Sequence, residues 1–168
     1  MVNYLYQCPK GYESFEKVKQ IIEENLPQGC SVKFAEAGGA KGFFNKMQEK
    51  MSYGFSKGKT LGEVDIKKNA YIGISVLCYS SDGVNNDYIS VTEYVPSDTI
   101  SFLMNHVLGY ATNLVFPAIF GRPDKVGEEI DKLIMSKIEV NKMDNSVSGS
   151  IKNIGKGLSV KESSVKEG

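Results

Sequence analysis

The chain has 168 residues, of which 41% are apolar and 24% are charged, and its 20 basic and 20 acidic side chains cancel. This length and composition are typical of a single globular domain that can bury a core without disulfides. A net charge near zero argues against nucleic-acid binding through overall charge, so we expect no nucleic-acid partner. All basic residues except Arg122 are lysines, and lysine lacks the planar fork used for two-point recognition of phosphate.

The cysteines indicate a reducing compartment. The three of them, Cys8, Cys30 and Cys78, are odd in number and widely spaced, which does not fit a disulfide framework. The N-terminal residues show no charged stretch followed by an apolar one, as a secretory signal would. No stretch of about 18 purely apolar residues occurs either. We therefore expect a cytoplasmic protein without an integral membrane span.

The first half of the chain predicts strands and helices in alternation. Phe15, Val18 and Ile22 repeat at helical spacing, which indicates an amphipathic helix. Glycines 38, 39 and 42 then introduce a segment with an apolar stripe, which we interpret as a second helix. The predicted elements are a strand over 2–7, a helix over 14–26, a strand over 31–35 and a helix over 43–53.

The second half predicts a strand pair followed by helices. Residues 81–86 are dense in turn formers and separate the two clearest strands of the chain, which indicates an antiparallel hairpin. Prolines 96, 117 and 123 mark the ends of the segments that follow. The predicted elements are strands over 64–66, 70–80 and 87–95, a long helix over 99–116 and a last helix over 124–139.

This order, β-α-β-α-β-β-β-α-α, predicts an α+β fold: an antiparallel or mixed sheet with helices packed on one face. We expect a single globular domain over residues 1–140. From residue 141 the chain is rich in Ser, Gly and Lys and has no aromatic residue, which predicts a flexible tail over 141–168.

One face of the strand pair suggests a recognition surface. Strand alternation places Ile74, Val76 and Ile89 on a core face and collects tyrosine, serine and threonine on the other. Rigid amphipathic rings suit protein contacts, although tyrosine and threonine also simply favour strands. The predicted protein-binding residues are Tyr71, Tyr79, Tyr88, Thr92 and Tyr94.

The segment Thr99–Gly121 is apolar around most of its circumference. It predicts a central core helix with an oligomer contact at one edge. Peripheral contact with a membrane is a further alternative, which the lack of a cationic face disfavours. An apolar ligand pocket between the sheet and the helix over 99–116 would place His106 and Tyr110 at the ligand. His106 is the only histidine, so an enzymatic mechanism based on imidazole would depend on it.

Other chemistry is weakly indicated. The glycine-rich turn at Gly39 and Lys41 precedes a predicted helix and could hold an anion, but it matches no nucleotide-binding motif. Three scattered cysteines and one histidine lack the paired spacing of zinc sites. We therefore assign no metal, no cofactor and no catalytic residue.

The function predicted from sequence is a non-enzymatic protein-binding or assembly module, self-associating or with a protein partner. Its contact surfaces would be the Tyr/Ser/Thr sheet face and an apolar helix edge. The alternative is a small-ligand-binding protein with an apolar pocket, and an enzyme that uses His106 ranks below both.

Overall fold

The computed structural model describes residues 2–36, 58–81 and 86–143. These residues form one six-stranded sheet in which every neighbouring pair of strands is antiparallel. The strand order across the sheet is β2-β3-β4-β5-β1-β6. The strands are β1 (Asn3–Pro9), β2 (Ser31–Glu36), β3 (Gly58–Lys67), β4 (Gly73–Ser81), β5 (Asn86–Tyr94) and β6 (Asn141–Met143).

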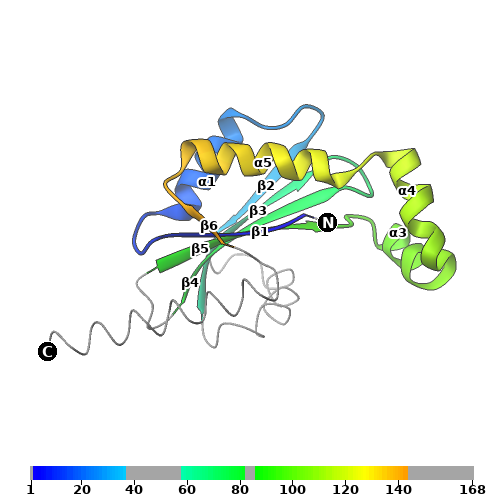
Figure 1. The fold of residues 1–168 in the computed structure, drawn as a ribbon, viewed down its shortest axis with the longest axis horizontal. Coiled ribbons are helices and arrows are strands. Elements are labelled where there is room, and N and C mark those ends of the chain that lie inside the picture. The colour runs from blue at the N-terminus through cyan, green and yellow to red at the C-terminus, as the bar shows by residue number, and fades with distance from the viewer. Residues whose placement is uncertain (1, 37–57, 82–85, 144–168) are drawn as a thin grey trace, which may run out of the picture.

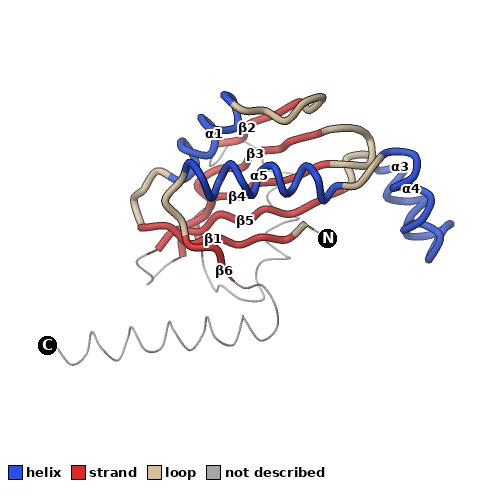
Figure 2. The backbone as a smooth tube through the Cα atoms, turned by 45° about the horizontal axis from the view of Figure 1, so that its top comes forward, coloured by secondary structure: helices blue, strands red, loops and turns tan. Residues whose placement is uncertain are grey.

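Two helices, α1 (Ser14–Glu24) and α5 (Pro123–Lys137), cover one face of this sheet (Figures 1 and 2). The described chain therefore has the predicted α+β architecture, with an antiparallel sheet and helices on one face. The predicted element order is recovered in outline, and the predicted helix over 43–53 lies outside the described residues.

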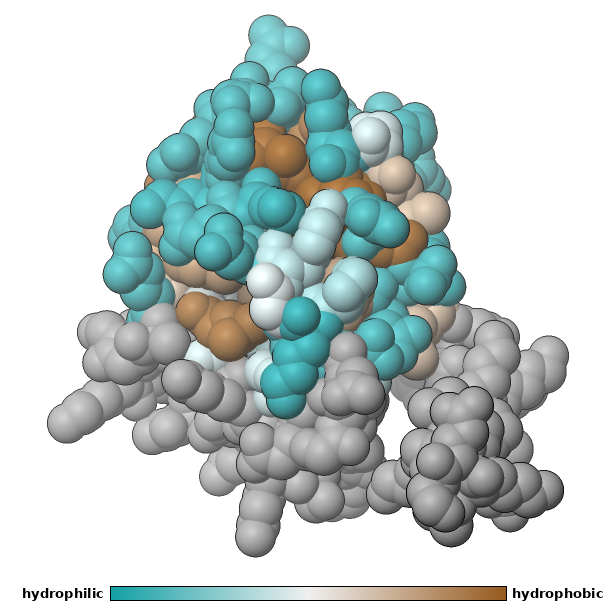
Figure 3. Space-filling view, turned by 90° about the vertical axis from the view of Figure 1, so that its left-hand side faces the viewer, coloured by the Kyte–Doolittle hydropathy of each residue, from teal (hydrophilic) through white to brown (hydrophobic). Residues whose placement is uncertain are grey.

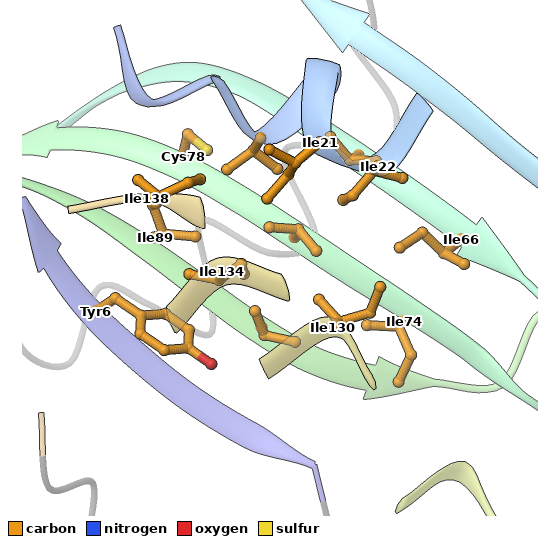
Figure 4. Packing of buried hydrophobic residues seen from close by; sticks show 14 of the residues in the cluster. Tyr6, Ile21, Ile22, Ile66, Ile74, Cys78, Ile89, Ile130, Ile134 and Ile138 are labelled. Atoms are coloured by element: carbon orange, nitrogen blue, oxygen red, sulfur yellow. The ribbon is translucent and has the colours of Figure 1, made fainter. Parts of the chain in front are cut away.

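The core lies between the two helices and the sheet (Figure 4). On α5, Val126, Ile130 and Ile134 follow one another at four-residue spacing, so their side chains align on the face that meets the strands. Ile22 of α1, Ile130 and Ile134 are all 0% exposed. Full burial of one such side chain contributes about 1.5–3 kcal/mol, so these residues hold the helices to the sheet.

Strand β3 is much longer than the predicted strand over 64–66. A register shift between Thr60 and Gly62 in the pairing with β4 interrupts the regular alternation, and such a bulge obscures the pattern in the sequence. Gly62 has a packing role there, because a Cβ at this position would lie 2.4 Å from the ring of Phe15. The missing side chain lets α1 approach the sheet.

The sheet extends into the segment predicted to be a tail. Residues Asn141–Met143 form β6, which pairs with β1. Lys142 Nζ lies 2.7 Å from Asp131 Oδ2 on α5, and Tyr6 Oη on β1 donates a 2.5 Å hydrogen bond to Asp131 Oδ1. The first three residues of the predicted tail thus belong to the sheet, and residues 144–168 lie outside the described residues.

Candidate docking site

The segment predicted as one long helix over 99–116 is instead a helical hairpin. Its first leg is α3 (Asp98–Leu103) followed by a π-helical segment, Met104–Leu108. The chain reverses at Gly109, whose φ of 47° is readily accessible to glycine, and continues through a short 3₁₀ turn, Gly109–Ala111, into α4 (Thr112–Phe120). The prediction of one central core helix was wrong, because none of the residues of α3 or the π-helical segment is buried.

Local interactions define both ends of the hairpin. The Ser97 hydroxyl accepts a hydrogen bond from the Ile100 N–H (3.3 Å) and caps α3. Gly121 follows α4 with a φ of 87° and ends the helix. Between the two legs, Thr112 Oγ1 donates to the Met104 carbonyl at 3.4 Å. The hairpin therefore has defined start and end points and a polar contact between its legs.

The base of the hairpin is attached to the turn that precedes β4. The Asn69 amide donates to the Phe120 carbonyl at 3.0 Å, and its oxygen accepts from the N–H groups of Tyr71 and Ile72 at 2.9 and 2.8 Å. The Tyr71 ring stacks on Phe116 with centroids 5.3 Å apart, and it also contacts Phe120. These contacts fix the base, while α3 and α4 extend beyond the end of the sheet (Figures 1 and 2).

Apolar side chains are exposed on both legs. Leu114 is 78% exposed, the largest value among the exposed large apolar residues described. The segment Thr99–Gly121 contains no Asp, Glu, Lys or Arg, although such residues make up 24% of the chain. Among residues 2–36, 58–81 and 86–143, six large apolar residues are exposed, and all but Met135 belong to this hairpin: Phe102, Val107, Leu114, Val115 and Ile119. A gathering of this kind marks an interaction site in folded proteins.

The opposite end of the molecule has a different surface. Seen from the side that faces away from the hairpin, hydrophilic residues cover most of the described surface, and apolar residues form small separate areas between them (Figure 3). Scattered apolar residues of this kind are normal on soluble surfaces. The contrast makes the hairpin the strongest candidate for a contact surface.

Of the predicted ligand-binding residues, the structure describes the side chain of His106 alone. His106 lies exposed on the π-helical segment, and its ring is 4.7 Å from that of Phe102. Tyr110 lies in the 3₁₀ turn, with its side chain outside the described part, and Gly39 and Lys41 also lie outside the described residues. The helices over the described sheet are α1 and α5, not residues 99–116. The expected position of the ligand pocket, between the sheet and residues 99–116, has no support among the described residues, so the pocket stays a prediction.

The other predicted surface, the Tyr/Ser/Thr face, lies on the side of the sheet opposite α1 and α5. Pairing of β4 with β5 places Tyr79 beside Tyr88, Ser75 beside Thr92 and Gly73 beside Tyr94, so the predicted alternation is confirmed for these residues. Tyr71 was placed wrongly, since it precedes β4 and stacks on α4 instead.

The tyrosine pair on this face is buried. Tyr79 and Tyr88 are 6% and 4% exposed, and their rings stack with centroids 5.4 Å apart. Leu77 joins them, with Leu5 and Met143 packed alongside. Burial and the neighbouring Tyr88 raise the pKa of the Tyr79 hydroxyl. Protein binding through this face stays a prediction, and the described geometry offers a partner little ring surface at these two residues.

The same face holds a buried acid that the sequence analysis did not identify. Glu63 is 3% exposed and accepts a 2.5 Å hydrogen bond from the Ser75 hydroxyl. Burial raises the pKa of its carboxyl group, the Ser75 hydrogen bond lowers it and the nearby Asp65 raises it. The sequence pattern that places Glu63 on this face is the alternation of Glu63, Asp65 and Lys67 with apolar residues. This pattern can be recognised only when the full length of β3 is known.

Beside Glu63, Tyr94 donates a hydrogen bond to the Asp65 carboxylate. Burial and this hydrogen bond raise the pKa of the Tyr94 hydroxyl. A shallow depression here is lined by Ser31, Lys33, Asp65, Lys67, Tyr94 and Pro96. Lysines beside an aspartate form an ordinary solvated charge pattern. Across residues 2–36, 58–81 and 86–143, no three Cys, His, Asp or Glu side chains group as metal ligands would.

Comparison with protein-family models, with curated proteins and with solved structures gave no match to this chain. Its function must therefore be inferred from its own geometry. In the described residues, no helix has both the length and the apolar character needed to cross a membrane.

Proposed function

We propose that this chain is a non-enzymatic docking module whose contact surface is the helical hairpin, Asp98–Phe120. The observation that carries the proposal is the exposure of apolar side chains along both legs of a segment whose one charged residue is Asp98 at its start. An apolar helix of a monomer normally buries its stripe against the domain core. Here Leu114 and Ile119 are 78% and 67% exposed, and covering them with another molecule would remove that area from water.

The attachment of the hairpin supports the proposal. Asn69 and Tyr71 hold its base through hydrogen bonds and ring stacking, so its apolar legs are presented on a fixed support. Preorganised surfaces bind with a smaller loss of conformational entropy than flexible ones. This corresponds to the apolar helix edge predicted from the sequence, now formed by two short helices.

Site-specific photocrosslinking tests the proposal. A photoreactive phenylalanine derivative would replace Leu114 in the full chain, and a matched derivative would replace Lys132, an exposed residue of α5. After irradiation in the cells that make the protein, we expect one dominant adduct from position 114 and none from position 132. The adduct can be a lipid, a second copy or another protein, and mass spectrometry would distinguish these. Equal or absent adducts at the two positions would contradict a docking role for the hairpin.

A further inference from the structure

The occupant of the hairpin surface can be inferred from the chemistry of that surface, an inference that rests on the proposed docking function. We propose that the hairpin pairs with the same hairpin of a second copy of this chain. The contact would be twofold symmetric, so that the four legs of two hairpins cover one another's apolar side chains.

Charge is balanced on and around the hairpin. The segment Thr99–Gly121 has no Asp, Glu, Lys or Arg, and the four charged residues closest to it along the chain are two acidic and two basic ones: Asp98, Arg122, Asp124 and Lys125. The whole chain likewise has 20 acidic and 20 basic side chains. A high net charge keeps proteins monomeric through mutual repulsion, so two copies of this chain can approach without that repulsion. The same balance offers an anionic membrane no excess of positive charge to attract.

The exposed polar side chains of the hairpin can pair with copies of themselves. They are those of Asn105, His106 and Asn113. An amide and a neutral imidazole each contain a hydrogen-bond donor and an acceptor, whereas a lysine only donates and a carboxylate only accepts. A surface of this chemistry suits a twofold contact, in which the same residues meet from both sides. Different proteins usually select one another by complementary charge, which Thr99–Gly121 does not offer.

Both legs of the hairpin expose apolar side chains, which a second hairpin can cover together. The legs contact each other on one side, where Thr112 Oγ1 donates to the Met104 carbonyl, and two helices alone leave their other sides exposed. In a bundle of four helices each helix has neighbours on two sides. Helices α3 and α4 extend beyond the end of the described sheet (Figures 1 and 2), so two hairpins can meet without collision of the two sheets.

The exposed apolar area is enough for a small homodimer interface. From the exposed fractions of its five large apolar residues, the hairpin presents roughly 400 Å² of apolar surface. Full burial on both copies would remove roughly 800 Å² from water, and because homodimer interfaces are about 65% apolar, this implies roughly 1,200 Å² in total. That total lies at the lower limit of specific, stable interfaces.

Analytical ultracentrifugation of the full chain tests the proposal. We expect pairs of chains at about 100 μM that dissociate into single folded chains at about 1 μM, because an interface of this size gives modest affinity. Raising the ionic strength from about 0.1 M to about 1 M shortens the screening length from about 10 to about 3 Å. This change should not weaken the association, because the proposed contact contains no ion pair.

Paired variants assign the association to the hairpin. Leu114→Glu introduces one carboxylate from each copy into the apolar contact, so we expect association to weaken about a hundredfold or more. Phe102→Glu should do the same from the first leg. Met135→Glu changes an exposed apolar residue on α5, and association should be unchanged. Circular dichroism melting would verify that each variant is folded.

Crosslinking between labelled copies locates the contact. An unlabelled chain with the photoreactive derivative at position 114 would be mixed with an isotope-labelled chain that lacks it. We expect an adduct in which the labelled peptide comes from the hairpin, Asp98–Phe120. The isotope distinguishes this adduct from a crosslink within one chain.

A chain that stays monomeric at about 100 μM, or an association that Leu114→Glu and Phe102→Glu leave unchanged, would overturn the self-association proposal. An adduct on the labelled copy outside the hairpin would also overturn it. The docking function is judged separately by the crosslink in cells. An adduct there with lipid or another protein, from a chain that is monomeric when purified, would keep the docking function and exclude a second copy. Absence of both adduct and self-association would exclude both.

Discussion

Helix α5 buries its apolar residues, whereas the hairpin of α3 and α4 exposes many of them, although the two regions are neighbours in the chain. Helix α5 is rich in charged residues and buries Val126, Ile130 and Ile134 almost completely. The hairpin has no charged residue from Thr99 to Gly121 and leaves Leu114 and Ile119 largely exposed. The number of apolar residues therefore does not decide burial. A polar face determines which side of a helix packs against the core, and in a helix without a polar face no side is preferred for burial.

The largest expected effect comes from deleting one side chain in each region. Ile130→Ala removes a fully buried side chain from the core, and we expect a loss of about 2–5 kcal/mol in the free energy of unfolding. Leu114→Ala removes a similar side chain that is 78% exposed, and the loss should stay within about 0.5 kcal/mol. Urea unfolding of the dissociated chain, followed by circular dichroism, measures both. Similar losses would mean that the Leu114 side chain is packed against other residues in solution, which would contradict the difference in burial between α5 and the hairpin.

A smaller effect is expected when a methyl group is added in each region. In Gly62→Ala the new Cβ would lie 2.4 Å from the buried Phe15 ring, and overpacking of this kind costs about 1–3 kcal/mol. In Gly109→Ala the new Cβ meets nothing within 4 Å, although the φ of 47° disfavours alanine, and the cost should be about 1 kcal/mol. Hydrogen exchange would locate each change. The first should destabilise the sheet and α1, and the second only the hairpin.

The pH dependence of stability extends the comparison to the face of the sheet opposite α1 and α5. There the carboxyl group of Glu63 is buried, whereas the hairpin exposes apolar side chains. The folded-state pKa of Glu63 is raised above 4.5, mainly by burial, so the folded chain holds this proton more tightly than the unfolded chain. The contribution of Glu63 to stability is therefore full below about pH 4.5 and is lost as the pH rises through the folded-state pKa.

Glu63→Gln removes this titration. Relative to the unmodified chain, the variant should become more stable as the pH rises from about 4.5 toward neutrality, with Glu36→Gln, an exposed residue of β2, as the matched control. Urea unfolding across this range measures the difference. A constant difference between Glu63→Gln and the unmodified chain would show that Glu63 does not titrate differently in the folded state.

Strand and helix positions near the core could be predicted because their side chains alternate or repeat with one period. Val18 and Ile22 placed α1, and Ile130 and Ile134 placed α5, since helical spacing and a polar opposite face point to one arrangement. The bulge at Gly62 hid most of β3, and the reversal at Gly109 hid the hairpin. At both positions glycine permits a local departure that leaves no periodic signal.

The candidate site was only half visible in the sequence. The apolar, uncharged character of Thr99–Gly121 is a local property, and it was evident from the residues alone. The attachment of this segment was not, because Asn69 is far from Phe120 in the chain and only the fold brings the two into hydrogen-bonding contact. Likewise, the sequence predicted that Tyr79 and Tyr88 share one face of the strand pair, while their direct pairing and burial were decided by the fold.

The sequence by itself determined the α+β class, the faces of the strand pair and the buried sides of α1 and α5. These follow from short-range periodicity, which the backbone geometry of strands and helices converts directly into sidedness. Only the tertiary structure decided that the most apolar segment lies beyond the sheet and that Glu63 is buried. The first depends on competition for the limited space over the sheet: α1 and α5, each with one apolar and one charged side, fill that space, and the apolar hairpin remains outside. The second depends on packing of the opposite face, where Glu63 accepts a hydrogen bond from Ser75 of the neighbouring strand.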